Sequence, residues 1–124
     1  MTINENDMNP GTREWITFSP GQVIFREGDA GDVLYVVIDG QVDVIVHDHL
    51  IASINGPGGI VGEMALIDAG PRSATAIAKT ECTLVPLNKE GFKLHIQKTP
   101  DFALDVMQVI SERLRKILQA SSRS

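Results

Sequence analysis

The sequence lacks the side chains that most redox and metal centres need. Cys82 is its only cysteine, which excludes an internal disulfide and an iron–sulfur cluster held by several thiolates of one chain. Because Cys82 stands in an apolar run, it is expected to be a buried, unreactive residue. The three histidines, His47, His49 and His95, are not spaced as a recognisable ligand set. We therefore expect no metal and no cofactor in this chain.

Long apolar runs and an excess of basic residues are also missing. The longest apolar run, Val33 to Ile38, is far too short to span a bilayer. Residues 1–11 are polar and acidic, unlike a signal peptide, so we expect a cytoplasmic protein with no membrane partner. The net charge of −5 disfavours nucleic acid as a partner. The one basic cluster, Arg113, Arg115 and Lys116, is interpreted as the solvated face of a helix.

The residues that are present fit one ordinary domain. The chain has 124 residues, of which 43% are hydrophobic, enough to bury a core without a disulfide or a metal. Residues 1–13 have no periodicity and predict a flexible N-terminal arm. Residues 14–124 are expected to fold as one domain, with a β-rich part at 15–87 and C-terminal helices at 88–119.

Short apolar runs alternate with turn residues through the β-rich part. This pattern predicts an antiparallel sandwich or barrel. Asp39-Gly40 separates two runs and favours a hairpin turn. His47 and His49 flank Asp48 at a second predicted hairpin tip, where solvated loop residues are expected. The predicted strands cover residues 23–25, 33–38, 42–46, 50–54, 74–78 and 82–87.

Helical patterns follow the last predicted strand. Asn88 can cap a helix over residues 89–97, and Thr99-Pro100-Asp101 is a strong signal for the start of another. From Phe102 to Leu118, apolar residues recur at helical spacing. The polar tail at 119–124 is expected to fray.

Residues 62–75 have the composition of a site for a small charged ligand. Gly62 allows a ligand to approach the backbone closely. The helix-forming residues 63–67 predict a short turn whose unpaired amides point at an anion, and Ala69-Gly70-Pro71 ends that turn. Arg72 then offers a planar fork to two oxygens of one phosphate, and Glu63 can accept a hydrogen bond from a sugar hydroxyl. Together they predict a nucleotide as the ligand.

The motif Gly62-Glu63-Met64-Ala65-Leu66, followed by Pro71-Arg72-Ser73-Ala74-Thr75, resembles the phosphate-binding cassette of cyclic nucleotide-binding domains. Such domains occur in catabolite activator proteins, kinase regulatory subunits and nucleotide-gated channels. The resemblance covers roughly residues 15–118. It implies a mainly β fold: an antiparallel, jelly-roll-like β-roll with a short cassette helix and C-terminal helices. Glycines in the turns at 28–32 and 39–40 match the family's structural glycines, which are expected to serve backbone conformation alone.

The resemblance also implies a ligand site without catalysis. Arg72 would neutralise the cyclic phosphate with help from the amides of Ala65 and Ala74, and Glu63 would accept the ribose 2′-hydroxyl. In the family, Ala or Ser directly after the arginine tends to accompany adenine, so Ser73 favours cyclic AMP and leaves cyclic GMP open. The expected ligand-binding residues are Gly62, Glu63, Met64, Ala65, Arg72, Ser73, Ala74 and Arg113.

Three roles stay open for the last helix: packing on the roll, a lid over the base, or a dimer seam. As a lid, it would bring Arg113 and either Leu114 or Ile117 to the purine. The activators continue into a DNA-reading helix-turn-helix, which these 124 residues do not contain, so we expect a stand-alone sensor. It would be a monomer or weak homodimer that repositions its last helix and acts on a separate, unidentified protein effector.

Two other classes of function compete with this reading. In the first, the roll is a docking module for another protein and binds no nucleotide. For the cassette alone, the alternative explanation is a tight loop between strands in which Glu63 and Arg72 merely pair with each other. In the second, the chain is a cupin-like metalloenzyme, which would need several histidines and a carboxylate converging from adjacent strands. The complete cassette argues against the first alternative, and the placing of the histidines argues against the second.

Overall fold

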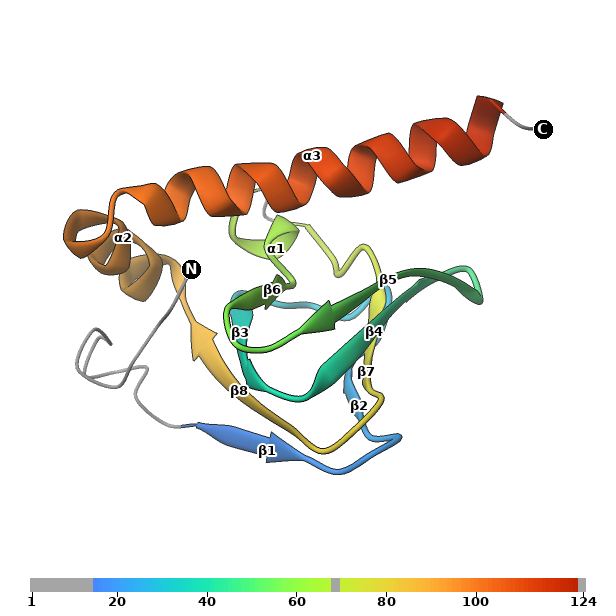
Figure 1. Cartoon of the computed structure of the whole chain (residues 1–124), viewed down its shortest axis with the longest axis horizontal. Coiled ribbons are helices and arrows are strands. Elements are labelled where there is room, and N and C mark those ends of the chain that lie inside the picture. Colours follow the sequence, from blue (N-terminus) through green and yellow to red (C-terminus); the bar gives the residue numbers. More distant parts are fainter. Residues whose placement is uncertain (1–14, 68–69, 123–124) are drawn as a thin grey trace.

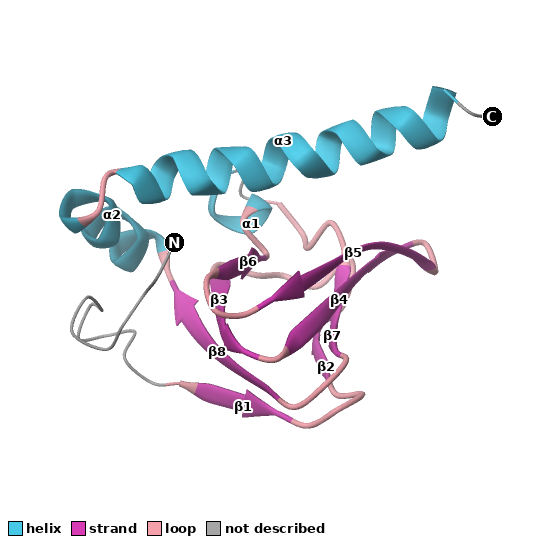
Figure 2. Cartoon of the chain, viewed as in Figure 1, coloured by secondary structure: helices cyan, strands magenta, loops and turns pink. Residues whose placement is uncertain are grey.

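The chain forms an antiparallel β-roll with helices along one side (Figures 1 and 2). The computed structural model describes residues 15–67 and 70–122. The predicted β-roll is confirmed. One sheet has the order β1 (Ile16–Phe18), β8 (Cys82–Leu87), β3 (Leu34–Asp39) and β6 (Gly59–Val61), and the other has β2 (Val23–Phe25), β7 (Thr75–Ala78), β4 (Gln41–Val46) and β5 (His49–Asn55).

The interior of the roll is filled by small and β-branched side chains from both sheets. Val42 and Val44 of β4 face inward beside Ala76 and Ala78 of β7, in the alternation expected of strands with one buried face. Cys82 belongs to this core and is fully buried, as predicted.

The other face of the β3–β8 sheet is buried under the C-terminal helices, α2 (Lys89–Lys98) and α3 (Asp101–Ser122). Phe102 and Val106 of α3 are almost fully buried against Leu34 and Leu87 of the sheet. The predicted capping of α2 is confirmed, since the side-chain oxygen of Asn88 accepts a hydrogen bond from Gly91 N at 2.8 Å. Packing of α3 on the roll is therefore established for its first two turns.

Two turn predictions have different outcomes. Asp39-Gly40 is not a hairpin turn, because β3 and β4 lie in different sheets and the chain crosses between them here. Gly40 has φ +94°, and a Cβ on it would overlap with the carbonyl oxygen of Glu81.

The hairpin tip at His47 and Asp48 is confirmed: both residues have positive φ and join the paired strands β4 and β5. Across the described part of the chain, no cluster of histidine, cysteine and acidic residues could hold a metal ion.

The helical predictions also need adjustment. The expected fraying of the tail is wrong for residues 119–122, which continue α3, because no glycine or proline interrupts the helix there. The short strands β1 and β6 were not predicted as strands, since three residues are too few to show alternation. Residues 1–14, which include the predicted N-terminal arm, lie outside the described part of the chain.

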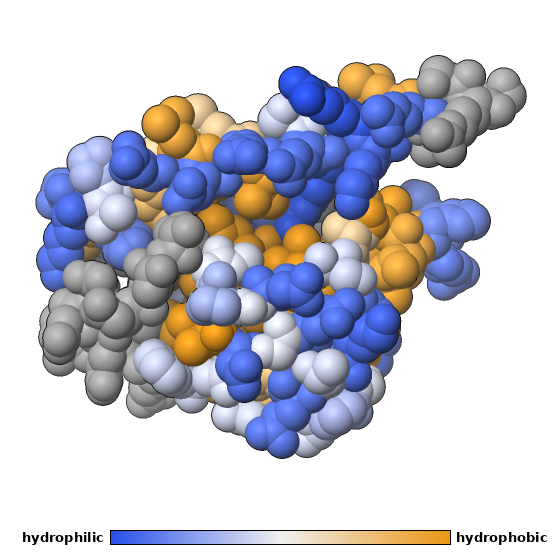
Figure 3. Space-filling view, in the orientation of Figure 1, coloured by the Kyte–Doolittle hydropathy of each residue, from blue (hydrophilic) through white to orange (hydrophobic). Residues whose placement is uncertain are grey.

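Orange apolar atoms lie among blue hydrophilic ones along α3 in Figure 3. Leu104, Met107, Leu114 and Leu118 are each more than half exposed, whereas Phe102 is buried. None of the described helices combines the length and the apolar composition that crossing a membrane requires. Whether α3 also serves as a lid or a dimer seam stays a prediction.

Candidate ligand-binding site

The predicted cassette lies where β6 leaves its sheet. Gly62 follows β6 directly and has φ +78°, a conformation that favours glycine. The chain then forms α1 (Met64–Ile67), the predicted short helix, which lies beneath α3 in Figure 1. Arg72 stands just before β7, so the cassette connects the two sheets. Both ends of the cassette are thus anchored in strands.

Arg72 is a buried cation, with 6% of its surface exposed. Its Nη1 donates to the carbonyl oxygens of Val33, at 2.8 Å, and Gly62, at 3.4 Å. Its Cζ lies 4.2 Å from the centre of the Phe25 ring. Burial lowers the pKa of Arg72 below its usual value, against the opposing influence of Tyr35 and nearby aspartates.

No carboxylate in residues 15–67 and 70–122 forms an ion pair with Arg72. Its Nε is buried and has no hydrogen-bond partner within that described part. A desolvated guanidinium with an unused donor is unfavourable until an anion approaches it. The arrangement is therefore suited to a negatively charged ligand.

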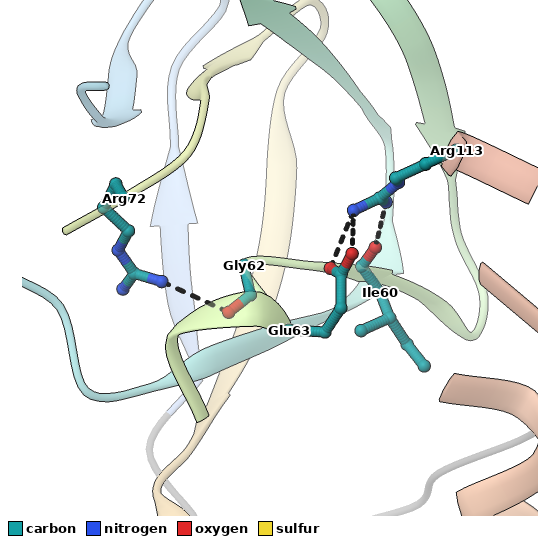
Figure 4. A network of polar contacts seen from close by, with 5 residues as sticks. All are labelled: Ile60, Gly62, Glu63, Arg72 and Arg113. Atoms are coloured by element: carbon teal, nitrogen blue, oxygen red, sulfur yellow. Dashed lines mark hydrogen bonds and ion pairs between the residues drawn. The ribbon is translucent and has the colours of Figure 1, made fainter. Parts of the chain in front are cut away.

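Glu63 is also buried, at 2% exposure, but its charge is balanced. Both of its carboxylate oxygens accept hydrogen bonds from Nη1 of Arg113 on α3, at 2.5 and 2.7 Å. Nη2 of the same arginine donates to the carbonyl oxygen of Ile60 at 2.7 Å. Figure 4 shows Arg113 and Arg72 approaching the Gly62–Glu63 pair from opposite sides.

These contacts correct two interpretations of the sequence. Glu63 and Arg72 do not pair with each other, so that alternative explanation of the cassette is wrong. Arg113 is not part of a solvated helix face, since only 17% of its side chain is exposed, whereas Arg115 and Lys116 are exposed as expected. Only the folded chain brings Arg113 to a carboxylate 50 positions away in the sequence.

A small pocket, with a cavity volume of about 30 Å³, is lined by both arginines. All eight residues predicted for the ligand site line it. The sequence analysis missed two further lining residues, Phe25 of β2 and Val44 of β4. Both belong to apolar strand runs that look like ordinary core, so no sequence signal distinguishes them from other buried residues. The full lining comprises Phe25, Val44, Gly62, Glu63, Met64, Ala65, Arg72, Ser73, Ala74 and Arg113.

Other details of the expected site differ from the structure. Leu114 is 53% exposed on α3 and does not line the pocket, and the side chain of Ile117 lies outside the described part. The amide of Ala65 was expected to be free for a phosphate, but it donates to Gly62 O at 3.3 Å because α1 starts there. Arg113, which was expected to reach a purine by a stacking or cation–π contact, instead donates from Nη1 to Glu63 and from Nη2 to Ile60 O, and its Nε has no partner among the described residues.

The chain is similar to known nucleotide-responsive proteins. It is 30% identical over 106 residues to a CRP-like cAMP-activated global transcriptional regulator of Mycobacterium tuberculosis, covering 82% of this chain and 47% of the relative. It is 38% identical over 93 residues to a cyclic nucleotide-gated potassium channel of Rhizobium etli, covering 75% of this chain and 26% of the relative. The chain thus spans half or less of the length of these relatives.

Solved structures agree with the fold. The catabolite activator protein of Thermus thermophilus superposes with a TM-score of 0.73 at 31% identity, covering 88% of this chain and 53% of that one. Family and fold are both those of regulatory domains rather than enzymes. The sequence model described as "Cyclic nucleotide-binding domain" matches residues 15–98. Because this match spans more than half of the chain, the protein belongs to the cyclic nucleotide-binding domain family.

Proposed function

We propose that this chain is a sensor that binds 3′,5′-cyclic AMP in the pocket between Arg72 and Arg113 and signals to a separate protein by repositioning α3. The observation that carries the proposal is the buried guanidinium of Arg72, which has an unused donor and no carboxylate partner among the described residues. A buried cation of this kind favours a phosphate, which accepts several hydrogen bonds at once.

Glu63 is the proposed hydrogen-bond acceptor for the ribose of the ligand. It lines the same pocket as Arg72, and the cassette separates the two side chains. Each carboxylate oxygen has two lone pairs, so Glu63 can accept a hydrogen bond from the ribose 2′-hydroxyl while it keeps its contact with Arg113. The phosphate and the ribose of one nucleotide would then occupy opposite ends of the pocket.

We propose cyclic AMP rather than cyclic GMP as the ligand for two reasons. Ser73 follows the phosphate arginine at the position where a small residue accompanies adenine in similar cassettes, and it lines the pocket. The name of the M. tuberculosis relative also specifies activation by cAMP. Nη1 and Nη2 of Arg113 donate to Glu63 and Ile60, so base selectivity is assigned here to Ser73.

Repositioning of α3 would follow from the shared use of Glu63. A ribose hydroxyl that binds Glu63 adds a second donor to the carboxylate, so the contact with Arg113 of α3 is kept but weakened. The ligand therefore has different interaction energies with the docked and the displaced helix, which is the requirement for shifting a conformational equilibrium. The effector that reads the helix position is a further protein.

Calorimetric titration with cyclic AMP and with cyclic GMP tests the proposal. We expect binding of both with cyclic AMP the tighter ligand, and a loss of affinity for both in Arg72→Ala. No heat with either nucleotide would overturn the proposal and favour the protein-docking alternative. Tighter binding of cyclic GMP would overturn the assignment of the base alone.

A further inference from the structure

The contacts that fix Arg72 come largely from one segment outside the predicted cassette, residues 25–33. The backbone of Arg72 is held on both sides by this segment: its N–H donates to Asp29 O at 2.7 Å, and its carbonyl accepts from Gly28 N at 2.8 Å. The side chain is held by the carbonyl oxygen of Val33, again at 2.8 Å. The loop between β2 and β3 therefore determines where the cassette arginine lies.

Phe25 provides a surface for the guanidinium plane. Arg72 Cζ lies 4.2 Å from the centre of its ring, within the range of a cation–π contact. The Tyr35 ring stacks against Phe25, with ring centres 6.1 Å apart and planes 18° from parallel, and its centre lies 5.9 Å from Arg72 Cζ. Because Arg72 is almost entirely removed from water, this aromatic face replaces solvent on one side of the cation.

Gly31 lies against the same guanidinium. A Cβ at Gly31 would overlap with Nε and Cζ of Arg72 and would lie 2.7 Å from Nη2. Gly31 does not have a positive φ, unlike Gly28 and Gly40, so its backbone would accept an alanine. The expectation that this glycine serves backbone conformation alone is therefore wrong. The absence of a side chain at position 31 leaves space for Arg72.

We propose that Phe25 and Gly31 form a slot that positions the Arg72 guanidinium for the ligand phosphate before the ligand binds. This inference rests on the proposed role of Arg72 in phosphate binding. A guanidinium already fixed in its bound orientation loses less side-chain entropy when the phosphate arrives, so the slot raises affinity through Arg72. Phe25 and Gly31 are positioning residues.

Gly31→Ala is the sharpest test, because the atoms that the new methyl group meets are the far end of a flexible side chain. The fold can accommodate the methyl by moving the guanidinium, so the thermal unfolding midpoint should stay close to that of the parent. Cyclic AMP affinity should fall by ~10-fold or more, since a displaced arginine loses charge-assisted hydrogen bonds. Phe25→Leu should lower the affinity by up to ~30-fold, the worth of a cation–π contact that is largely removed from water.

Controls separate positioning from general damage. Ala30→Ser adds an atom at the neighbouring, exposed position, and Phe92→Leu makes the same aromatic change in the core cluster under α2. Both controls should bind cyclic AMP as the parent does. In an Arg72→Ala background, Gly31→Ala should cause no further loss, because the side chain that it displaces is gone. An equal loss in both backgrounds would overturn the inference.

A nucleotide-free measurement keeps this inference distinct from the proposed function. In the parent, the Nε–Hε resonance of Arg72, assigned by its loss in Arg72→Lys, should carry a ring-current shift from Phe25. That shift should disappear in Phe25→Leu and in Gly31→Ala. If it persists in Gly31→Ala, the slot is wrong. If the parent binds no cyclic nucleotide while the shift behaves as expected, the proposed function fails and the slot remains as a structural feature.

Discussion

The two buried charges of the pocket, Glu63 and Arg72, are neutralised in opposite ways. Glu63 has a counter-charge from within the protein, because Arg113 places one nitrogen against both carboxylate oxygens. Arg72 has none among the described residues: two backbone carbonyls and the Phe25 ring surround it, and its Nε has no partner there. Both side chains are more than nine-tenths buried, so the difference does not reflect exposure.

The two charges therefore have different roles, one in stabilising the fold and one in binding an anion. A buried ion pair contributes to holding the fold, because removing one partner leaves the other charge desolvated and alone. A buried cation without an anion contributes little to folding and gains most from a ligand that supplies the missing charge. The Glu63 end therefore connects the pocket to α3, whereas the Arg72 end is kept ready for an anion. The following variants test this division, from the largest expected effect to the smallest.

Arg113→Ala should lower the free energy of unfolding by ~3–5 kcal/mol, because it leaves the carboxylate of Glu63 buried and unpaired. Urea unfolding followed by circular dichroism measures this loss. Arg115→Ala, an exposed arginine on the same helix, is the matched control and should change stability by no more than ~0.5 kcal/mol. Equal stability of the two variants would remove the proposed structural role of the pair.

Arg72→Ala should lower the affinity for the ligand and leave the stability of the fold nearly unchanged. Cyclic AMP affinity should fall by ~2–5 kcal/mol, or tens- to thousands-fold, in a calorimetric titration. Stability should fall far less than in Arg113→Ala, because the variant removes an unpaired charge instead of creating one. The exposed Arg26 lies in the adjacent loop, and Arg26→Ala should bind like the parent. A larger loss of stability than of affinity would reverse the division of tasks.

Glu63→Gln should remove the preference for the ribose hydroxyl. The parent is expected to bind cyclic AMP more tightly than its 2′-deoxy analogue by ~1–3 kcal/mol, the worth of a hydrogen bond to a charged group. That difference should shrink in Glu63→Gln and persist in Glu90→Gln, which changes an exposed carboxylate on α2. Undiminished discrimination in Glu63→Gln would exclude contact between Glu63 and the 2′-hydroxyl.

Arg113→Lys should have the smallest effect. A lysine keeps the positive charge for Glu63 but loses the second nitrogen, which donates to Ile60 O. The expected loss of stability is ~0.5–1.5 kcal/mol, the worth of one hydrogen bond, again measured in urea. A loss as large as that of Arg113→Ala would mean that the fork geometry of the guanidinium matters more than its charge.

The local elements of the fold were predictable, whereas the pairing of strands was not. Turn residues and apolar runs located six strands within one or two residues, and Asn88 located the start of α2. The same local signals made Asp39-Gly40 look like a hairpin. A turn motif carries no information on whether the next strand pairs with the previous one or crosses to the second sheet, and here it crosses.

For the candidate site, the sequence supplied the residue types but not their environments. All eight predicted residues line one pocket, because seven of them lie in a single motif and Arg113 lies on a predictable helix. Phe25, Gly31 and the carbonyl oxygen of Val33 were missed as partners of Arg72. A backbone carbonyl has no sequence signature, and an aromatic residue in an apolar strand looks like core until the fold places a cation on it.

The sequence by itself determined the β-rich class, the cassette with its acid and its base, and the two C-terminal helices, because these depend on local spacing, turn chemistry and helical periodicity. The tertiary structure alone decided that the charge of Glu63 is paired and that the charge of Arg72 has no counter-charge among the described residues. Glu63 meets Arg113 across 50 positions, and Arg72 rests on Phe25 and beside Gly31 from a different strand connection. Contacts between distant segments depend on how the two sheets and α3 pack, and no local pattern encodes that packing.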